Sequence, residues 1–239
     1  MQPVWIIAKR ELTAYFDSLI AYFVMVLFLA FSGFFTWLAG NGDVFFRKQA
    51  DLLVFFSVAK WTLFFFIPAI TMRQMAEERK TGTIELLLTK AVSNRQVILG
   101  KFLSCLIMVA LTLLLTLPYY VTVSMLGEID HGATICGYLG LLLLSSAYIA
   151  IGLFASSITS NQIVAFLLAL FIGIFFQFLF EVIADGLTGF LGELFSTLSL
   201  TRHFDSISRG VLDTKDIIYF LSITFLGLFL SEISLSKRS

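Results

Sequence analysis

Long apolar segments alternate with short polar segments along most of the chain. Six segments each hold about 20 predominantly apolar residues, the length that a helix rising about 1.5 Å per residue needs to cross a hydrocarbon core of about 30 Å. They run from Leu19 to Ala39, Leu52 to Met72, Phe102 to Leu126, Thr134 to Ser157, Ile163 to Val182 and Ile217 to Leu235. Because backbone polar groups inside a bilayer must be satisfied within the segment, we expect six spanning α-helices, with bends at Pro68 and Pro118.

The segment before the first span, 1–18, is amphipathic rather than continuously apolar. Lys9 and Arg10 fall on one side of a helical projection, where they can reach the anionic headgroups of a membrane. The opposite side carries apolar residues at steps of three and four, namely Trp5, Ala8, Leu12, Tyr15, Phe16 and Leu19. The pattern predicts an interfacial helix lying in the membrane surface. The alternative is a cytoplasmic extension of the first span.

Segment 183–216, between the fifth and sixth spans, is too polar and too rich in glycine to cross a membrane. Its large apolar residues nevertheless recur at helical spacing in two series, Leu187, Phe190, Leu191, Leu194, Phe195 and Leu198, and then Phe204, Ile207 and Val211. A structureless loop would have no need to keep such side chains in phase. We therefore expect two short amphipathic helices on the outer face, which dip toward the bilayer or cap the bundle.

The longest polar segment, 73–101, connects the second and third spans. It begins with charged residues and then turns, through Glu77, Glu78, Arg79, Lys80, Thr81 and Gly82. Thr83 can act as a helix N-cap, and Glu85 is favourably placed in the first turn. We expect a short helix from Thr83 to Thr89. Because so short a helix cannot bury its own apolar cluster, that cluster either lies back on the bundle or inserts into a groove on a cytoplasmic partner, and its members are Ile84, Leu86, Leu87 and Leu88.

Composition sets the class of protein. Of the 239 residues, 59% are hydrophobic and 13% are charged, which is more apolar surface than a water-soluble domain of this length can bury. The formal net charge is zero and the basic residues form no extended patch, so nothing indicates nucleic acid as a partner. The sequence predicts an all-α polytopic membrane protein that forms a single transmembrane domain over 1–239, in contact with the lipid bilayer.

The distribution of basic residues predicts the orientation, since segments flanking the cytoplasmic face usually carry more lysine and arginine. One face collects ten, namely Lys9, Arg10, Arg73, Arg79, Lys80, Lys90, Arg95, Lys101, Lys237 and Arg238. The other face has five, Arg47, Lys48, Arg202, Arg209 and Lys215, together with more acidic residues. Both termini and segment 73–101 are therefore predicted to be cytoplasmic.

Lys60 lies inside the second span, about 12 Å from its outer end by helix rise. A charge at that depth costs roughly 2.5 to 3.5 kcal/mol on the insertion scale unless it reaches the interface or is paired. Either the ammonium reaches the interface along its own flexible side chain, or it has a partner or a hydrated cavity. Lys60 is therefore a candidate intramembrane polar site.

Residues able to support catalysis or bind a metal are sparse. Cys105 and Cys136 fall in apolar runs and are interpreted as small buried side chains. His131 and His203 both lie on the predicted outer side, and the acidic neighbours of His131 fit a solvated turn better than a metal site. No acid-base cluster indicates an intramembrane enzyme and no ring of charge indicates an ion channel, so we expect no catalytic, cofactor-binding or metal site in this chain.

The stretch "EERKTGTIELLLTKAVSNRQVILGK" resembles the loop between the second and third spans of ABC-2 type transporter permeases. In that family the loop forms the coupling helix that docks on the ATP-binding subunit. The match covers Glu77, Glu78, Lys80, Gly82, Thr83, Glu85, Leu86, Leu87, Gly100 and Lys101. Ala91 departs from the pattern, because the family often has proline there. The resemblance therefore leaves the exit from the helix less rigidly defined.

Four further stretches, "IPAITMR", "GTIELLLTK", "AYIAIGLFASSITSNQIVAF" and "HFDSISRGVLDTKDIIYFLSIT", are most similar to the gliding-motility-associated permease subunit of that family. The resemblance implies a bacterial inner-membrane protein that pairs with its own copy or a sister permease. It also implies a separate ABC ATP-binding subunit, which would hold ATP and Mg²⁺. The residues expected to contact that subunit are Glu77, Glu78, Gly82, Thr83, Ile84, Glu85, Leu86, Leu87 and Leu88.

The residues themselves also indicate that ATP is hydrolysed elsewhere. A phosphate-binding loop needs glycine, four residues and then Gly-Lys-Ser/Thr, whereas Gly100 and Lys101 are followed by Phe102. The leading hypothesis is thus a non-catalytic permease subunit of an ATP-driven exporter. The alternative is a subunit that moves no solute and passes a mechanical or assembly signal to a periplasmic partner.

Overall fold

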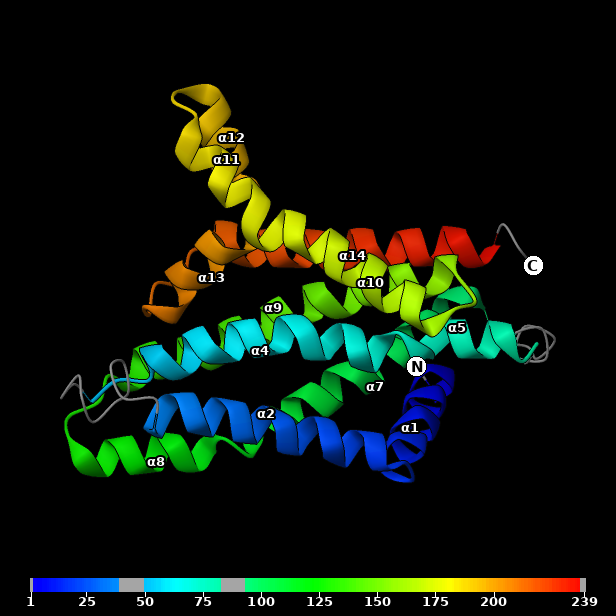
Figure 1. Ribbon diagram of the computed structural model, residues 1–239, viewed down its shortest axis with the longest axis horizontal. Helices are drawn as coiled ribbons and strands as arrows, with labels where there is room; N and C mark the ends of the chain where they lie inside the picture. The colour runs from blue at the N-terminus through cyan, green and yellow to red at the C-terminus, as the bar shows by residue number, and fades with distance from the viewer. Residues whose placement is uncertain (1, 39–49, 83–92, 237–239) are drawn as a thin grey trace.

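The computed structural model of the protein describes residues 2–38, 50–82 and 93–236. The expected helix from Thr83 to Thr89 lies outside these residues. Within them, six helical segments are long and apolar enough to cross a membrane, which confirms the all-α polytopic fold. Figure 1 shows these segments side by side as one elongated bundle.

The six spans are found where the apolar segments predict them. They are α2 (Leu19–Trp37), α4 (Leu53–Thr71) with α5 (Arg73–Lys80), α7 (Asn94–Leu114) with α8 (Leu117–Leu126), α9 (His131–Ile158), α10 (Gln162–Ile174) with η1 (Phe175–Leu179) and α11 (Phe180–Gly186), and α14 (Thr214–Ser236). The third span is interrupted just before Pro118, where α7 gives way to α8, as expected. The second span continues past Pro68 to Thr71 and is interrupted at Met72, where α4 gives way to α5. The charged residues after Met72 form helix α5.

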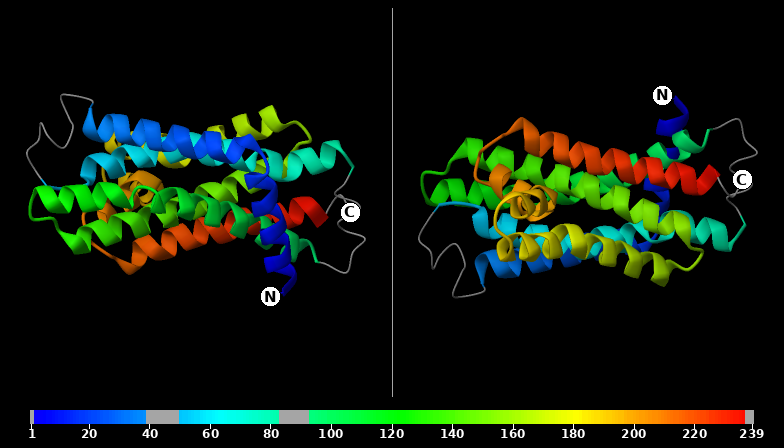
Figure 2. Two further views of the ribbon diagram at one scale, coloured as in Figure 1. Left: turned by 90° about the horizontal axis from the view of Figure 1, so that it is seen from below. Right: turned by 90° about the horizontal axis from the view of Figure 1, so that it is seen from above.

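Helix α1 (Gln2–Phe16) is separate from the first span. It crosses the end of the bundle at a steep angle to α2 and packs mainly against α7 (Figures 1 and 2). Ala8 and Tyr15 are buried against the bundle, whereas Trp5 and Ile6 are exposed. The helix is therefore not a straight extension of the first span. Its placement in a membrane surface stays a prediction.

Helix α9 is the centre of the bundle and packs against α4, α7, α10, α13 (Leu200–Ser208) and α14. Small residues along α9 allow these close approaches. A Cβ atom on Gly140 would lie 3.0 Å from Ile207 of α13, and one on Gly137 would overlap the ring of Phe56 in α4. The packing thus explains why glycine occurs inside an apolar span.

The fifth span contains a π-helical segment, η1, between α10 and α11, and such a segment is a common cause of a change in helix direction. Beyond it, α11 and α12 (Phe190–Leu198) project sideways from the bundle (Figure 1). Helix α13 instead lies against α9 and α14. Two amphipathic helices thus occur in segment 183–216 as predicted, but α11 extends to Gly186, Leu187 precedes α12 and Val211 follows α13.

Candidate functional site

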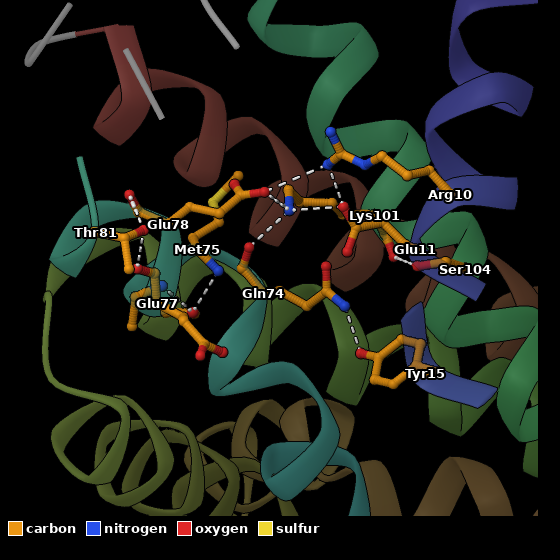
Figure 3. A network of polar contacts seen from close by, with 12 residues as sticks. Arg10, Glu11, Tyr15, Gln74, Met75, Glu77, Glu78, Thr81, Lys101 and Ser104 are labelled. Carbon is orange, nitrogen blue, oxygen red and sulfur yellow. Dashed lines mark hydrogen bonds and ion pairs between the residues drawn. The ribbon is translucent and has the colours of Figure 1, made fainter. Parts of the chain in front are cut away.

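A cluster of polar side chains joins three helices at the end of the bundle where α5 and α7 lead toward segment 83–92 (Figure 3). Helix α1 contributes Arg10 and Glu11, α5 contributes Gln74 and Glu78, and α7 contributes Lys101. Helix α1 is far from the other two in sequence, whereas α5 and α7 lie on either side of segment 83–92. The cluster, which we call the Lys101 cluster, therefore determines how the two ends of segment 83–92 are held relative to each other.

Lys101 is the centre of this cluster and is 1% exposed. Its ammonium donates to Glu78 Oε1 at 2.8 Å, to the Gln74 carbonyl oxygen at 2.8 Å and to Glu11 Oε1 at 3.3 Å. An ammonium has three N–H groups, so every donor of this buried cation has an acceptor. Arg10 also donates to Glu78 Oε1, at 3.4 Å. The cation thus links α1, α5 and α7 directly.

Gly100 permits this arrangement because α1 crosses α7 directly above it. A Cβ atom on Gly100 would lie 2.7 Å from Ile7 Cβ and 3.1 Å from the Val4 carbonyl oxygen, closer than atoms normally approach. With glycine there, α1 comes near enough for Glu11 to reach Lys101. The sequence pair Gly100-Lys101 therefore has a local structural reason.

Tyr15 makes a second connection between α1 and the second span. Its buried hydroxyl donates to the Ile70 carbonyl oxygen at 3.1 Å and accepts a hydrogen bond from Gln74 Nε2. Burial raises the pKa of the Tyr15 phenol well above its ordinary value. Tyr15 therefore remains a neutral hydrogen-bonding group at physiological pH.

Ser156 of α9 sets the direction of α5 where it leaves α4. Its hydroxyl accepts hydrogen bonds from the backbone N–H groups of Met75 and Ala76 at 3.1 and 3.0 Å, and donates to the Met72 carbonyl oxygen at 2.9 Å. Met72 is the residue at which α4 ends and α5 begins. A side chain from the central helix thus satisfies the backbone groups that this break leaves unpaired.

The beginning of α7 is fixed by a capping box. Ser93 Oγ accepts from the Gln96 backbone N–H at 3.3 Å, while Gln96 Oε1 accepts from the Ser93 N–H at 3.1 Å. The signature Ser-x-x-Gln is visible in the sequence. Helix α7 therefore has a defined start on the far side of segment 83–92.

The sequence-predicted contact residues divide into two groups. Glu77 pairs with Arg73 at 2.9 Å, Glu78 lies within the Lys101 cluster, and Gly82 has a φ of 71°, which confirms the expected turn because glycine adopts that conformation readily. The others, Thr83, Ile84, Glu85, Leu86, Leu87 and Leu88, lie outside the described residues. Their contact with an ATP-binding subunit, like that of Glu77 and Glu78, stays a prediction.

Sequence reasoning assigned no site role to Glu11, Gln74, Lys101 or Ser156. One available signal was the position of Lys101. It lies inside α7, past the start of the helix at Asn94, and an apolar run follows it. A charge in that position calls for a partner. Which helix supplies the partner depends on the crossing of α1 over α7, and a single sequence does not reveal that crossing.

The charges of the Lys101 cluster change the pKa of Glu11 and therefore its contribution to stability at low pH. Burial raises the pKa of Glu11, but Lys101 and Arg10 lower it more, so the net value lies below 4.5. A lowered pKa means that the carboxylate stabilises the folded state above pH 4.5 and loses this contribution as the pH falls through the folded-state value.

Glu11→Gln should therefore lower the thermal midpoint of unfolding at pH 7, and the difference from wild type should become smaller at pH 3, below 4.5. Asp17→Asn, which removes an exposed carboxylate beyond the same helix, serves as the control and should show little difference at either pH. An equal difference at both pH values would contradict the ionised role of Glu11.

Lys60 has a partner at the other end of the bundle. Its ammonium lies 2.9 Å from Asp205 Oδ1 of α13 and 5.6 Å from the ring centroid of Phe204, and only 7% of the side chain is exposed. Of the alternatives open from the sequence, the structure supplies a partner. The pair joins α4 to α13.

The cysteines and His131 also lie within the described residues. Cys105 and Cys136 are free and buried, and His131 Nδ1 lies 2.7 Å from the Tyr120 hydroxyl. In the part of the chain that the structure describes, no group of three or more histidine, cysteine, aspartate or glutamate side chains could hold a metal ion.

The chain matches the model of a known family. A family model described as ABC-2 family transporter protein matches residues 5–222. This range includes most of α1, the Lys101 cluster and α13. No curated protein matches the chain.

Proposed function

Because the chain belongs to the ABC-2 family of transporter proteins and is a multi-pass membrane permease subunit, we propose that an ATP-binding subunit docks on its segment 83–89 and powers export. The family implies such an ATP-binding partner, which would bind ATP and Mg²⁺ while this chain contributes no catalytic residue. The charge distribution supports an inner-membrane location with both termini in the cytoplasm. The resemblance to gliding-motility permeases supports a role in that process.

The observation that carries this proposal is the burial of Lys101 between three helices. Segment 83–92 is attached to the bundle by α5 on one side and α7 on the other. Glu78 and Lys101 tie these two helices together at 2.8 Å, and Glu11 ties α1 to the same cation at 3.3 Å. A force applied to segment 83–92 would therefore be transmitted to α1, α5 and α7 together and would not displace one helix alone.

The route from this cluster into the bundle also has a structural basis. Helix α5 continues α4, and Ser156 of α9 fixes the junction between them. Displacement of α5 would thus move the second span against the central helix, which is a rigid-body mechanism common in switching proteins. A second permease subunit, either a sister chain or another copy, would form the other half of the transporter, and the transport path would run between the two subunits.

The docking surface can be tested by combining Glu85→Lys with Leu87→Asp. The first change reverses a charge and the second places a carboxylate in the expected apolar contact, so capture of the ATP-binding subunit by the tagged permease should fall at least about tenfold. Quantitative co-purification from detergent measures it. Unchanged capture would exclude this surface.

Leu191→Asp combined with Glu193→Lys provides a matched control. Both residues are exposed on α12 and have the same two-residue separation, but α12 belongs to the opposite end of the bundle (Figure 1). Capture should be retained. Stimulation of the bound ATPase by a lipid or glycan would favour export, whereas stimulation only by an added periplasmic protein would favour the signalling alternative.

A further inference from the structure

His203 and Asp216 form a buried pair where α13 meets the beginning of α14. His203 Nδ1 lies 2.6 Å from Asp216 Oδ1, and His203 Nε2 lies 3.0 Å from the Thr197 carbonyl oxygen. The imidazole also stacks on the Tyr219 ring, with 4.0 Å between centroids and 21° between planes. The histidine ring is thus held on both edges and on one face.

The contacts of the two ring nitrogens require an additional proton. A carbonyl oxygen and a carboxylate oxygen only accept hydrogen bonds, whereas a neutral imidazole has a single N–H to donate. A neutral ring beside an ionised Asp216 would leave two lone pairs facing each other at 2.6 or 3.0 Å. Rotating the ring by 180° would instead place carbon atoms against both oxygens. The pair is satisfied when one more proton sits on the ring or on the carboxyl group.

Burial strengthens this requirement. Asp216 is 1% exposed, and its Oδ2 atom has no hydrogen-bond partner among the described residues. An ionised carboxylate with an unpaired oxygen away from water is costly. Sharing a proton with His203 compensates that charge where solvent cannot.

We propose that His203 and Asp216 are a proton-binding site whose bound proton fastens α13 to α14. Asp205 on the same helix α13 binds Lys60 of α4, so the occupied site connects the last span to the second span. Release of the proton would weaken that connection. This site goes beyond the proposed export function and does not depend on an ATP-binding partner.

The neighbouring charged groups already form their own pairs. They are Lys60 of α4 with Asp205 of α13, Arg202 of α13 with Asp185 of α11, and Lys215 of α14 with Asp213, while the phenols of Tyr219 and, on α9, Tyr148 complete the surroundings. Hydrogen bonds from Lys215 hold the pKa of Asp213 below its ordinary value. Ordinary aspartate, lysine, arginine and tyrosine residues titrate outside pH 6–9. A change in stability between pH 6 and 9 that arises at this site therefore reports on the His203–Asp216 pair.

The test is the pH dependence of unfolding of the purified chain in lipid nanodiscs. A proton that the folded chain binds and the unfolded chain does not stabilises the fold, and this contribution is lost as the pH rises and the proton is released. The unfolding equilibrium of the wild type should shift toward the unfolded state by up to about tenfold per pH unit. Glu193→Gln, which removes an exposed carboxyl group on α12, should keep this dependence.

Asp216→Asn should abolish the dependence. The asparagine amide can donate to Nδ1 while the neutral ring donates through Nε2 to Thr197, so every hydrogen bond is made without the additional proton. If this variant does not fold, His203→Gln, which has no titrating ring, takes its place in the comparison.

Nitrogen-15 spectra of labelled histidine provide a second measurement. The sequence has two histidines, so His131→Gln leaves His203 as the only source of signal. Either a second ring N–H on His203 or a pH dependence that Asp216→Asn removes supports the proton-binding site. A ring with a single N–H from pH 5.5 to 9, together with the same pH dependence in wild type and Asp216→Asn, overturns it.

Discussion

Lys101→Met is expected to lower the free energy of unfolding of the purified chain by about 3–5 kcal/mol, the cost of removing one partner from a buried ion pair. Without the ammonium, Glu11 and Glu78 would face each other with 14% and 18% of their side chains exposed and no buried cation between them. Unfolding in mixed micelles measures the loss. Capture of the ATP-binding subunit should fall with it, because α5 and α7 would no longer be tied together.

Two variants separate this effect from a general loss of charge. Lys9→Met removes an exposed cation from the same end of the bundle and should change stability by less than about 0.5 kcal/mol. Adding Glu11→Gln and Glu78→Gln to Lys101→Met removes the uncompensated anions and should recover more than half of the lost stability. If Lys101→Met behaves like Lys9→Met, the cluster does not hold the three helices.

The six spans could be predicted from the sequence because each depends on one local requirement, a long apolar segment whose backbone pairs within itself. The turn at Gly82 and the break before Pro118 also depend on local backbone chemistry, since glycine readily adopts a positive φ and proline fixes φ and has no N–H to donate. The Ser93 capping box also lies within four consecutive residues. It was missed although its pattern was present.

The Lys101 cluster and the His203–Asp216 pair could not be predicted in this way. Lys101 is 90 residues from Glu11 in sequence, and their contact depends on how closely α1 crosses α7 at Gly100. His203 and Asp216 are 13 residues apart, but they meet only because α13 folds back against α14. In both places the chemistry depends on a helix crossing, and the spacing of apolar residues indicates helices without giving their crossings.

The Lys101 cluster and the Lys60–Asp205 ion pair lie toward opposite ends of the second span. At one end α4 continues into α5 and the Lys101 cluster, and toward the other end Lys60 holds Asp205 of α13. Movement of α4 relative to α9 would therefore displace both the Lys101 cluster and the Lys60–Asp205 pair. We therefore expect the contact between α4 and α9 to determine whether motion at one end of α4 is transmitted to the other end.

Gly152→Ala is expected to disturb that contact and to cost about 1–3 kcal/mol, the usual range for overpacking a core. A Cβ atom on Gly152 would overlap Thr71 Oγ1 and would lie 2.8 Å from Thr71 Cβ. Thr71 is fully buried at the end of α4, and its hydroxyl donates to the Ile67 carbonyl oxygen at 2.9 Å. Because this buried β-branched side chain has few rotamers available inside a helix, we expect the α4–α5 junction to move away from α9.

The displacement should also weaken the hydrogen bonds of Ser156, which is one helical turn beyond Gly152. Unfolding in mixed micelles and capture of the ATP-binding subunit should therefore both decline. Gly186→Ala is the control, because an added Cβ there meets nothing within 4 Å. Thr71→Ala combined with Gly152→Ala removes the Oγ1 and Cγ2 atoms but leaves the 2.8 Å approach of Thr71 Cβ, so it should restore only part of the loss. Full restoration, or no effect of Gly152→Ala beyond that of Gly186→Ala, would show that the two helices are not in close contact at this crossing.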